Sequence, residues 1–208
     1  HTGFAAAWDD SRLQAPIYVD GLEVPFFEFS VFVMGGRSVC ITSRESPLII
    51  KLAGREIAEK CFQVPEEPGW VTLAIENLGT GERSKLHVFT LQAAVATTPN
   101  LSIQGYQIGA YPVRPLRGLD IYRPPSGFVE LTKENMNVRV SPNFTLGQFV
   151  AKQGGTYPRY LLLKSELLMK LENILASLNA AGYAVERLVI MSGYRTPYYN
   201  KLIGNVTY

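Results

Sequence analysis

The chain has 208 residues, of which 47% are hydrophobic and 18% are charged, and its formal net charge is only +2. This length and composition allow a buried core and one or two domains. No run of lysine and arginine indicates a nucleic-acid partner, and no apolar stretch reaches the about 20 residues that span a bilayer. We therefore expect neither a nucleic-acid partner nor a transmembrane segment.

The first half of the chain has the pattern of a β-protein. Residues 27–33 and 71–76 alternate in a way that can bury one face of a strand, and residues 86–92 supply a further strand. Turn-forming glycines and prolines separate these runs at the spacing of a small sandwich. We expect a mainly β, immunoglobulin-like sandwich over residues 14–98, with Thr-Thr-Pro-Asn at 97–100 as a linker.

Residues 51–62 are ambiguous. Several of them favour a helix, but Gly54 and the β-rich neighbourhood favour a strand and a turn, which is the structure we expect.

Two cysteines, Cys40 and Cys61, stand in this first half. They are compatible with one disulfide in an oxidising compartment. Two separate buried thiols are the alternative, because a pair of cysteines in a sequence fixes no geometry.

The sequence predicts a helix that begins near the middle of the second half. Thr145 can cap a helix while Gln148 reaches back to it, and Phe144 can pack on Phe149, so a capping box and a hydrophobic staple coincide. The sequence predicts that this helix runs to the glycines at 154–155.

A second, longer helix is predicted over residues 161–181, ending at Gly182. Its apolar residues recur at three- and four-residue steps and form an expected core stripe of Leu167, Leu171, Ile174, Leu175 and Leu178. The short apolar run at 188–191 predicts a buried strand on which this helix packs.

A corner follows this expected strand. Ser192 and Gly193 interrupt the apolar run, Thr196 can cap a new helix, and Pro197 suits the first helical position. Arg195 then lies at the mouth of an expected pocket. Its planar guanidinium is suited to a carboxylate or a developing oxyanion, whereas the alternative is a surface arginine paired with a nearby acid.

These residues resemble a known family. The motif Ser-Gly-Tyr-Arg-Thr-Pro-x-x-Asn at 192–200, followed by Ile-Gly-Asn at 203–205, is similar to the signature of zinc D-alanyl-D-alanine carboxypeptidases and dipeptidases, which share a core with lysostaphin-type enzymes and hedgehog. Further blocks resemble the family in order at 105–112, 124–132 and 141–149. The resemblance implies an α+β zinc peptidase-like domain over residues 101–208.

The resemblance also implies where the metal is held. In the family a His and an Asp soon after the corner, and a second His near a catalytic Glu, bind zinc. The residues printed here end before these positions, and the two histidines, His1 and His87, lie far upstream. We therefore expect a domain that is incomplete in this chain, a zinc cofactor, and no metal ligand among these residues.

Four residues are the expected site. Arg195 is the catalytic candidate, as a clamp for a substrate carboxylate or as support for charge on the scissile carbonyl oxygen. Ser192, Tyr194 and Asn200 are substrate-binding candidates, although Tyr194 is also expected to pack and Asn200 to bond back to the corner. Ser192 lacks the neighbouring base that a serine nucleophile needs.

The block at 141–149 departs from the family, because Asn143 stands where a histidine is expected and Ala151 where a cysteine is expected.

The implied activity is zinc-dependent hydrolysis of peptidoglycan stem-peptide bonds by a secreted or periplasmic bacterial enzyme. The chain begins with His1 rather than Met, which fits a processed export product. The alternative is a non-catalytic cell-wall binding or scaffold protein that retains the peptidase fold.

Overall fold

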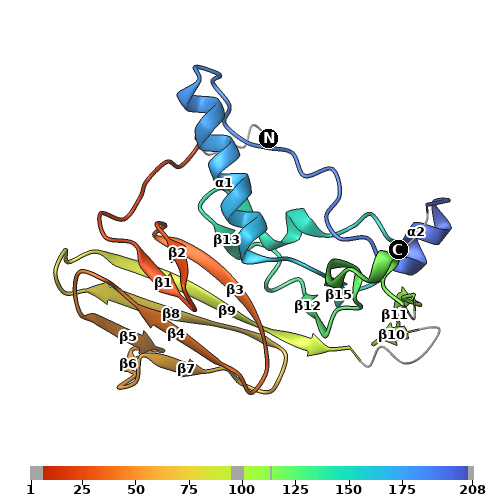
Figure 1. Cartoon of the computed structure of the whole chain (residues 1–208), viewed down its shortest axis with the longest axis horizontal. Coiled ribbons are helices and arrows are strands. Elements are labelled where there is room, and N and C mark those ends of the chain that lie inside the picture. Colours follow the sequence, from red (N-terminus) through yellow and green to blue (C-terminus); the bar gives the residue numbers. More distant parts are fainter. Residues whose placement is uncertain (1–6, 95–100, 113, 206–208) are drawn as a thin grey trace.

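A computed structural model describes residues 7–94, 101–112 and 114–205 of the chain. The structure is mainly β, as the sequence predicts, and most of its strands pair antiparallel (Figure 1). No helix in these described ranges is both long and apolar enough to cross a membrane.

The described residues of the first half lie in two sheets. The smaller sheet has the order β2-β1-β4-β7. The larger has the order β15-β12-β9-β8-β5-β6, with β3 also paired to β9, and its strands β12 (Gly127–Leu131) and β15 (Arg159–Leu161) come from the second half. The strands of the smaller sheet are β1 (Ile17–Val19), β2 (Leu22–Val24), β4 (Ser38–Thr42) and β7 (Cys61–Gln63). The first-half strands of the larger sheet are β3 (Glu28–Met34), β5 (Leu48–Leu52), β6 (Arg55–Glu56), β8 (Gly69–Asn77) and β9 (Arg83–Ala93).

Strand β9 is the centre of the larger sheet. It pairs with β8 antiparallel and with β3 in parallel, so that Val88 lies beside Val71 on one strand and Val31 on the other. Such neighbouring β-branched side chains fit a pleated, buried surface. The predicted strands at 27–33, 71–76 and 86–92 are thereby confirmed.

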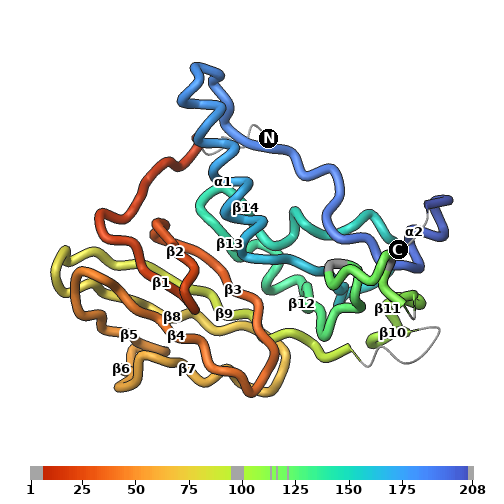
Figure 2. Tube along the Cα trace, viewed as in Figure 1, coloured from red at the N-terminus to blue at the C-terminus, as the bar shows by residue number. Residues whose placement is uncertain are grey.

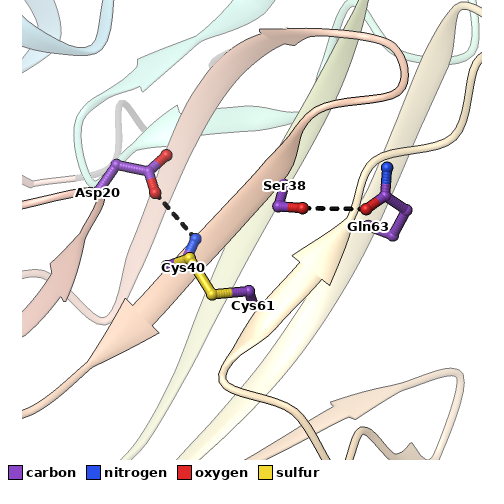
Figure 3. The surroundings of a disulfide bond; sticks show 5 residues. All are labelled: Asp20, Ser38, Cys40, Cys61 and Gln63. Atoms are coloured by element: carbon purple, nitrogen blue, oxygen red, sulfur yellow. Dashed lines mark hydrogen bonds between the residues drawn. A yellow bond between two sulfur atoms is a disulfide. The ribbon is translucent and has the colours of Figure 1, made fainter.

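The two cysteines form a disulfide. Strands β4 and β7 pair so that Cys40 and Cys61 lie directly opposite each other, and their sulfur atoms are bonded (Figure 3). The Oδ1 atom of Asp20 accepts a hydrogen bond of 2.9 Å from the Cys40 backbone, and Ser38 donates one of 2.9 Å to Gln63. The disulfide thus crosslinks two adjacent strands of the smaller sheet.

The ambiguous segment at 51–62 is a strand and a turn, as expected. Strands β5 and β6 are joined by Ala53 and Gly54, which both have positive φ angles of 48° and 79°. Two successive positive φ angles suit the tight turn of a hairpin, and glycine adopts them readily.

The second half continues the larger sheet. Strand β12 (Gly127–Leu131) pairs with the end of β9, and β15 (Arg159–Leu161) pairs with β12. Val129 and Leu131 belong to the same buried hydrophobic cluster as Val31 and Val88. The two halves therefore share one core. Figure 2 shows that their traces adjoin where β9 meets β12. The expected linker at 97–100 lies outside the described residues.

The remaining elements are not part of these two sheets. They include two hairpins, β10 (Leu101–Ile103) with β11 (Tyr106–Gly109) and β13 (Arg139–Ser141) with β14 (Phe144–Thr145). The helices of the described residues are three short 3₁₀-helices, η1 (Leu116–Gly118), η2 (Asp120–Tyr122) and η3 (Leu146–Phe149), and two α-helices, α1 (Ser165–Ala180) and α2 (Pro197–Leu202).

The long predicted helix is α1, but the expected core stripe is wrong in part. Leu167 and Ile174 are 44% and 49% exposed, whereas Leu168 and Leu175 are fully buried. The buried face also contains Glu172, which an apolar pattern assigns to solvent. Hydrogen-bond donors from β13 and the turn after it hold this carboxylate inside, so the face of the helix that points inward differs from the expected one.

The predicted helix after Thr145 is shorter than expected. The Gln148 side chain accepts a hydrogen bond of 2.8 Å from the Thr145 backbone, and the rings of Phe144 and Phe149 are 6.0 Å apart, so the cap and the staple are present. The helix nevertheless stops at Phe149 because Val150 is extended. A glycine at position 147 and a β-branched residue at 150 both disfavour a longer helix.

The strand predicted at 188–191 does not form. The backbone groups of residues 186–194 make no hydrogen bond to any other described residue. Leu188 and Ile190 pack on the core, while Val189 and Met191 are each 72% exposed. The alternation of a strand is present, but the neighbouring strand that would complete its ladder is not among the described residues.

Candidate functional site

The site expected at the Ser192–Arg195 corner is built on the first turn of α2. The Thr196 hydroxyl accepts a hydrogen bond of 3.0 Å from the Tyr199 backbone, and Pro197 follows it, so the predicted cap is confirmed. The same hydroxyl donates a bond of 2.7 Å to Gln153, whose amide donates one of 2.8 Å to the Gln107 carbonyl. Thr196 and Gln153 are both buried, so this chain of bonds fixes the start of α2 on β11.

Gly193 allows the corner to lie against η3. A Cβ atom at this position would be only 1.9 Å from the Phe149 carbonyl oxygen, a distance that no side chain can adopt. Gly109 has a similar role opposite α2, because a Cβ there would be 2.6 Å from the Tyr198 nitrogen. The two glycines therefore permit close backbone contacts on either side of the corner.

Tyr194 packs into the molecule. Its ring lies 5.7 Å from that of Phe128 in β12, and its hydroxyl is hydrogen-bonded to the hydroxyl of Tyr111. Burial raises the pKa of Tyr111 to about 12, and burial together with Tyr111 raises the pKa of Tyr194 well above its usual value. Both phenols are therefore neutral at ordinary pH, and they can offer hydrogen bonds but no charge.

Arg195 points away from this packed layer. Its Nε donates a hydrogen bond of 3.1 Å to the Ser192 hydroxyl, and the side chain is exposed. It forms no ion pair with a carboxylate among the described residues. The two terminal guanidinium nitrogens are thus available for a planar anion, and Ser192 fixes the direction of the fork.

Asn200 does not make the expected bond back to the corner. Within the described part of the chain, its side chain has no hydrogen bond to any of residues 192–195. Its carbonyl instead accepts a bond of 2.8 Å from Asn205, and Gly204, with a φ of 78°, bonds to Lys201. This pair of bonds is a Schellman motif, which confirms the predicted end of α2.

Asn143 is part of a second polar cluster, which the sequence analysis missed. Glu172 of α1 is completely buried and accepts hydrogen bonds from the Ser141 hydroxyl (2.6 Å), the Asn143 backbone (2.8 Å) and the Asn143 amide (2.7 Å). The same amide donates to the Asp9 carbonyl at 2.9 Å. Asn143 thus connects α1 with the N-terminal segment.

No metal site can be assembled from the described residues, because no group of three His, Cys, Asp or Glu side chains lies close enough together. His87 is buried in β9, where its ring nitrogens are 2.8 Å from Thr72 and 2.8 Å from Glu28. The residues present do not fit a zinc ion.

The chain has no match among family models, curated proteins or solved structures. The class of protein therefore has to be inferred from the geometry and from the motif at 192–205.

Sequence reasoning identified the arginine and the cap but missed Gln153, Tyr111 as the partner of Tyr194, and Glu172. A buried glutamine has no local signature, since its partners come from β11 and α2. Glu172 does have a weak local signature, because it lies four residues after Leu168 and three before Leu175, on the face of α1 that is buried.

Proposed function

We propose that residues 101–205 are the substrate-contacting part of a zinc-dependent peptidase that hydrolyses peptidoglycan stem-peptide bonds, as D-Ala-D-Ala carboxypeptidases do. The observation that carries the proposal is the geometry of Arg195. An exposed guanidinium, oriented by Ser192 and free of carboxylate partners among the described residues, is suited to the terminal carboxylate of a peptide.

The rigid base of the corner supports this role. Binding sites are most precise when the residues that carry them are locked by packing and by hydrogen bonds behind them. Thr196, Gln153, Gly193 and Tyr194 provide such a base directly behind Arg195. Ser192 and Tyr194 are proposed as supporting residues of the substrate site, and Asn200 as a further contact from α2.

The unpaired segment at 186–194 agrees with a domain that further strands complete. Its apolar residues alternate between packed and exposed, as in a strand that has one face on the core. The zinc cofactor rests on the family resemblance alone, because the described residues do not hold it. In such enzymes the metal activates a water molecule.

We further propose that strands β1 to β9 form an immunoglobulin-like sandwich. Val39 and Ile41 of the smaller sheet share one hydrophobic cluster with Leu73 and Val88 of the larger sheet, as expected for two sheets packed face to face. The disulfide agrees with a secreted or periplasmic location, because disulfides persist in oxidising compartments.

Binding of a peptide to the 208-residue chain tests the arginine without requiring catalysis. A peptide ending in D-Ala-D-Ala should bind with a free C-terminal carboxylate and lose affinity about tenfold when that carboxylate is amidated, since a charge-assisted bond is lost. Arg195→Ala should remove this preference, and Lys201→Ala in the same helix should keep it. Equal binding of both peptides by the unaltered chain would contradict the role of Arg195.

Catalysis is tested on the polypeptide extended beyond Tyr208. There Arg195→Ala should lower kcat/KM by about 10²–10³, the effect of losing one preorganised oxyanion donor. Arg195→Lys should rescue little, because an ammonium cannot reproduce the planar fork. Peptide binding without hydrolysis in the zinc-loaded extended polypeptide would favour the alternative, a cell-wall binding protein.

A further inference from the structure

A pocket lies at the junction of the two halves, where β9 begins. It has a volume of about 390 Å³ and is bordered by the N-terminal segment, the first residues of β3 and β9, and the β13–β14 hairpin. Its walls include Asp9, Phe27, Arg83, Lys85, Arg139 and Pro142. Ligand sites occur preferentially at such junctions.

The pocket has an excess of available positive charge. Arg83, Lys85 and Arg139 line it, and neither Lys85 nor Arg139 forms an ion pair with a described residue. Arg83 has only a long contact of 3.5 Å with Glu76, and its side chain is 79% exposed, so this ion pair is weak.

The two carboxylates of the pocket already have partners. Asp9 accepts hydrogen bonds from the backbone (3.0 Å) and the hydroxyl of Ser11. Glu28 is 2.8 Å from the buried Nε2 of His87. These hydrogen bonds leave the negative charges of Asp9 and Glu28 in place. Three cations against these two carboxylates leave the lining with one net positive charge, so the pocket favours a ligand of negative charge.

The lining of the pocket also includes apolar residues. Phe27, Ala74 and Pro142 contribute side chains that cannot bond to a fully hydrated ion but can pack against hydrocarbon. We propose that this pocket binds a small organic anion, with a carboxylate directed to Arg83, Lys85 and Arg139 and an apolar body on Phe27 and Pro142. The pocket shares no residue with the 192–200 corner, so this site is independent of the proposed peptidase function.

The test is a titration of the 208-residue chain in which binding is monitored by two-dimensional ¹H–¹⁵N NMR. The probes are phenylacetate, its neutral analogue phenylacetamide, and inorganic phosphate. Phenylacetate should shift the amide signals of Arg83 and Lys85 saturably, and each of the other two probes should bind about tenfold more weakly, because one lacks the charge and the other the apolar body.

Variants locate the site. Lys85→Met and Arg139→Met should each weaken phenylacetate binding about tenfold, the loss of one charge-assisted bond. Lys152→Met, which removes an exposed cation outside the pocket, should leave binding unchanged. Unchanged dispersion of the spectra shows that the variants are folded. The absence of saturable shifts at Arg83 and Lys85, equal binding of phosphate, or an equal effect of Lys152→Met would overturn the proposal.

Discussion

Strand β3 and residues 186–194 are both extended and apolar, but the structure holds them in different ways. All seven residues of β3 have a partner in β9, and the Ser30 carbonyl also accepts a bond of 3.0 Å from Ser165. The backbone of residues 186–194 has no hydrogen-bond partner in the described chain. Val31 in β3 is 8% exposed, whereas Val189 is 72% exposed. Apolar side chains favour a strand, but a neighbouring strand has to pair with it.

The largest expected effect on stability concerns the disulfide between the paired strands β4 and β7. Cys40→Ala combined with Cys61→Ala opens a crosslink between residues 21 positions apart, which should cost about 3 kcal/mol of unfolding free energy by loop entropy. Urea unfolding of the double variant and of the disulfide-bonded chain measures this difference. An unchanged midpoint with an unchanged slope would show that the strand ladders alone hold the smaller sheet.

A smaller loss of unfolding free energy is expected when the hydrogen bonds between α1 and the β13–β14 hairpin are removed. Glu172→Ala leaves the hydroxyl of Ser141 and two donors of Asn143 without their acceptor in a buried place, which should cost about 2 kcal/mol. The control is Glu166→Ala, an exposed position in the first turn of the same helix, which should cost less than 1 kcal/mol, roughly the helix-dipole effect. Similar losses of unfolding free energy in the two variants would contradict the expected contribution of the buried Glu172 carboxylate.

Gly193 tests the backbone contact that the unpaired segment makes with η3. Gly193→Ala places a Cβ against the Phe149 carbonyl, so the corner has to move and stability should fall by about 1–2 kcal/mol. Gly154→Ala is the matched control, because a Cβ there has open space and the change should stay within about 0.5 kcal/mol. If Gly193→Ala is as neutral as the control, the corner is not fixed by η3.

The smallest effect is expected on the exposed face of the unpaired segment. Met191→Ser should change the stability of the 208-residue chain by less than about 0.5 kcal/mol, because the side chain has little burial to lose. Val31→Ser, in the paired strand, should be clearly destabilising, since it removes a buried side chain and introduces an unpaired hydroxyl. Equal effects would mean that residues 186–194 are packed as firmly as β3.

The local features of the site were predictable. Thr196 and Pro197 at the start of α2, Gly204 at its end and Gly182 at the end of α1 all have the predicted roles. The position of Arg195 beside Ser192 also follows from the motif, since the two residues are three apart. Each of these features depends on bonds between near neighbours, which the sequence places together by itself.

By itself, the sequence determined the mainly β first half, the end of α1 at Gly182, the start and end of α2 at Thr196 and Gly204, and the exposed arginine at the corner. Only the tertiary structure decided that Glu172 is buried, that Thr196 is fixed by Gln153 at a separation of 43 residues, and that residues 188–191 have no ladder. The physical reason is the same in each case: a buried polar group or an extended backbone is stable only with a partner, and these partners come from distant parts of the chain.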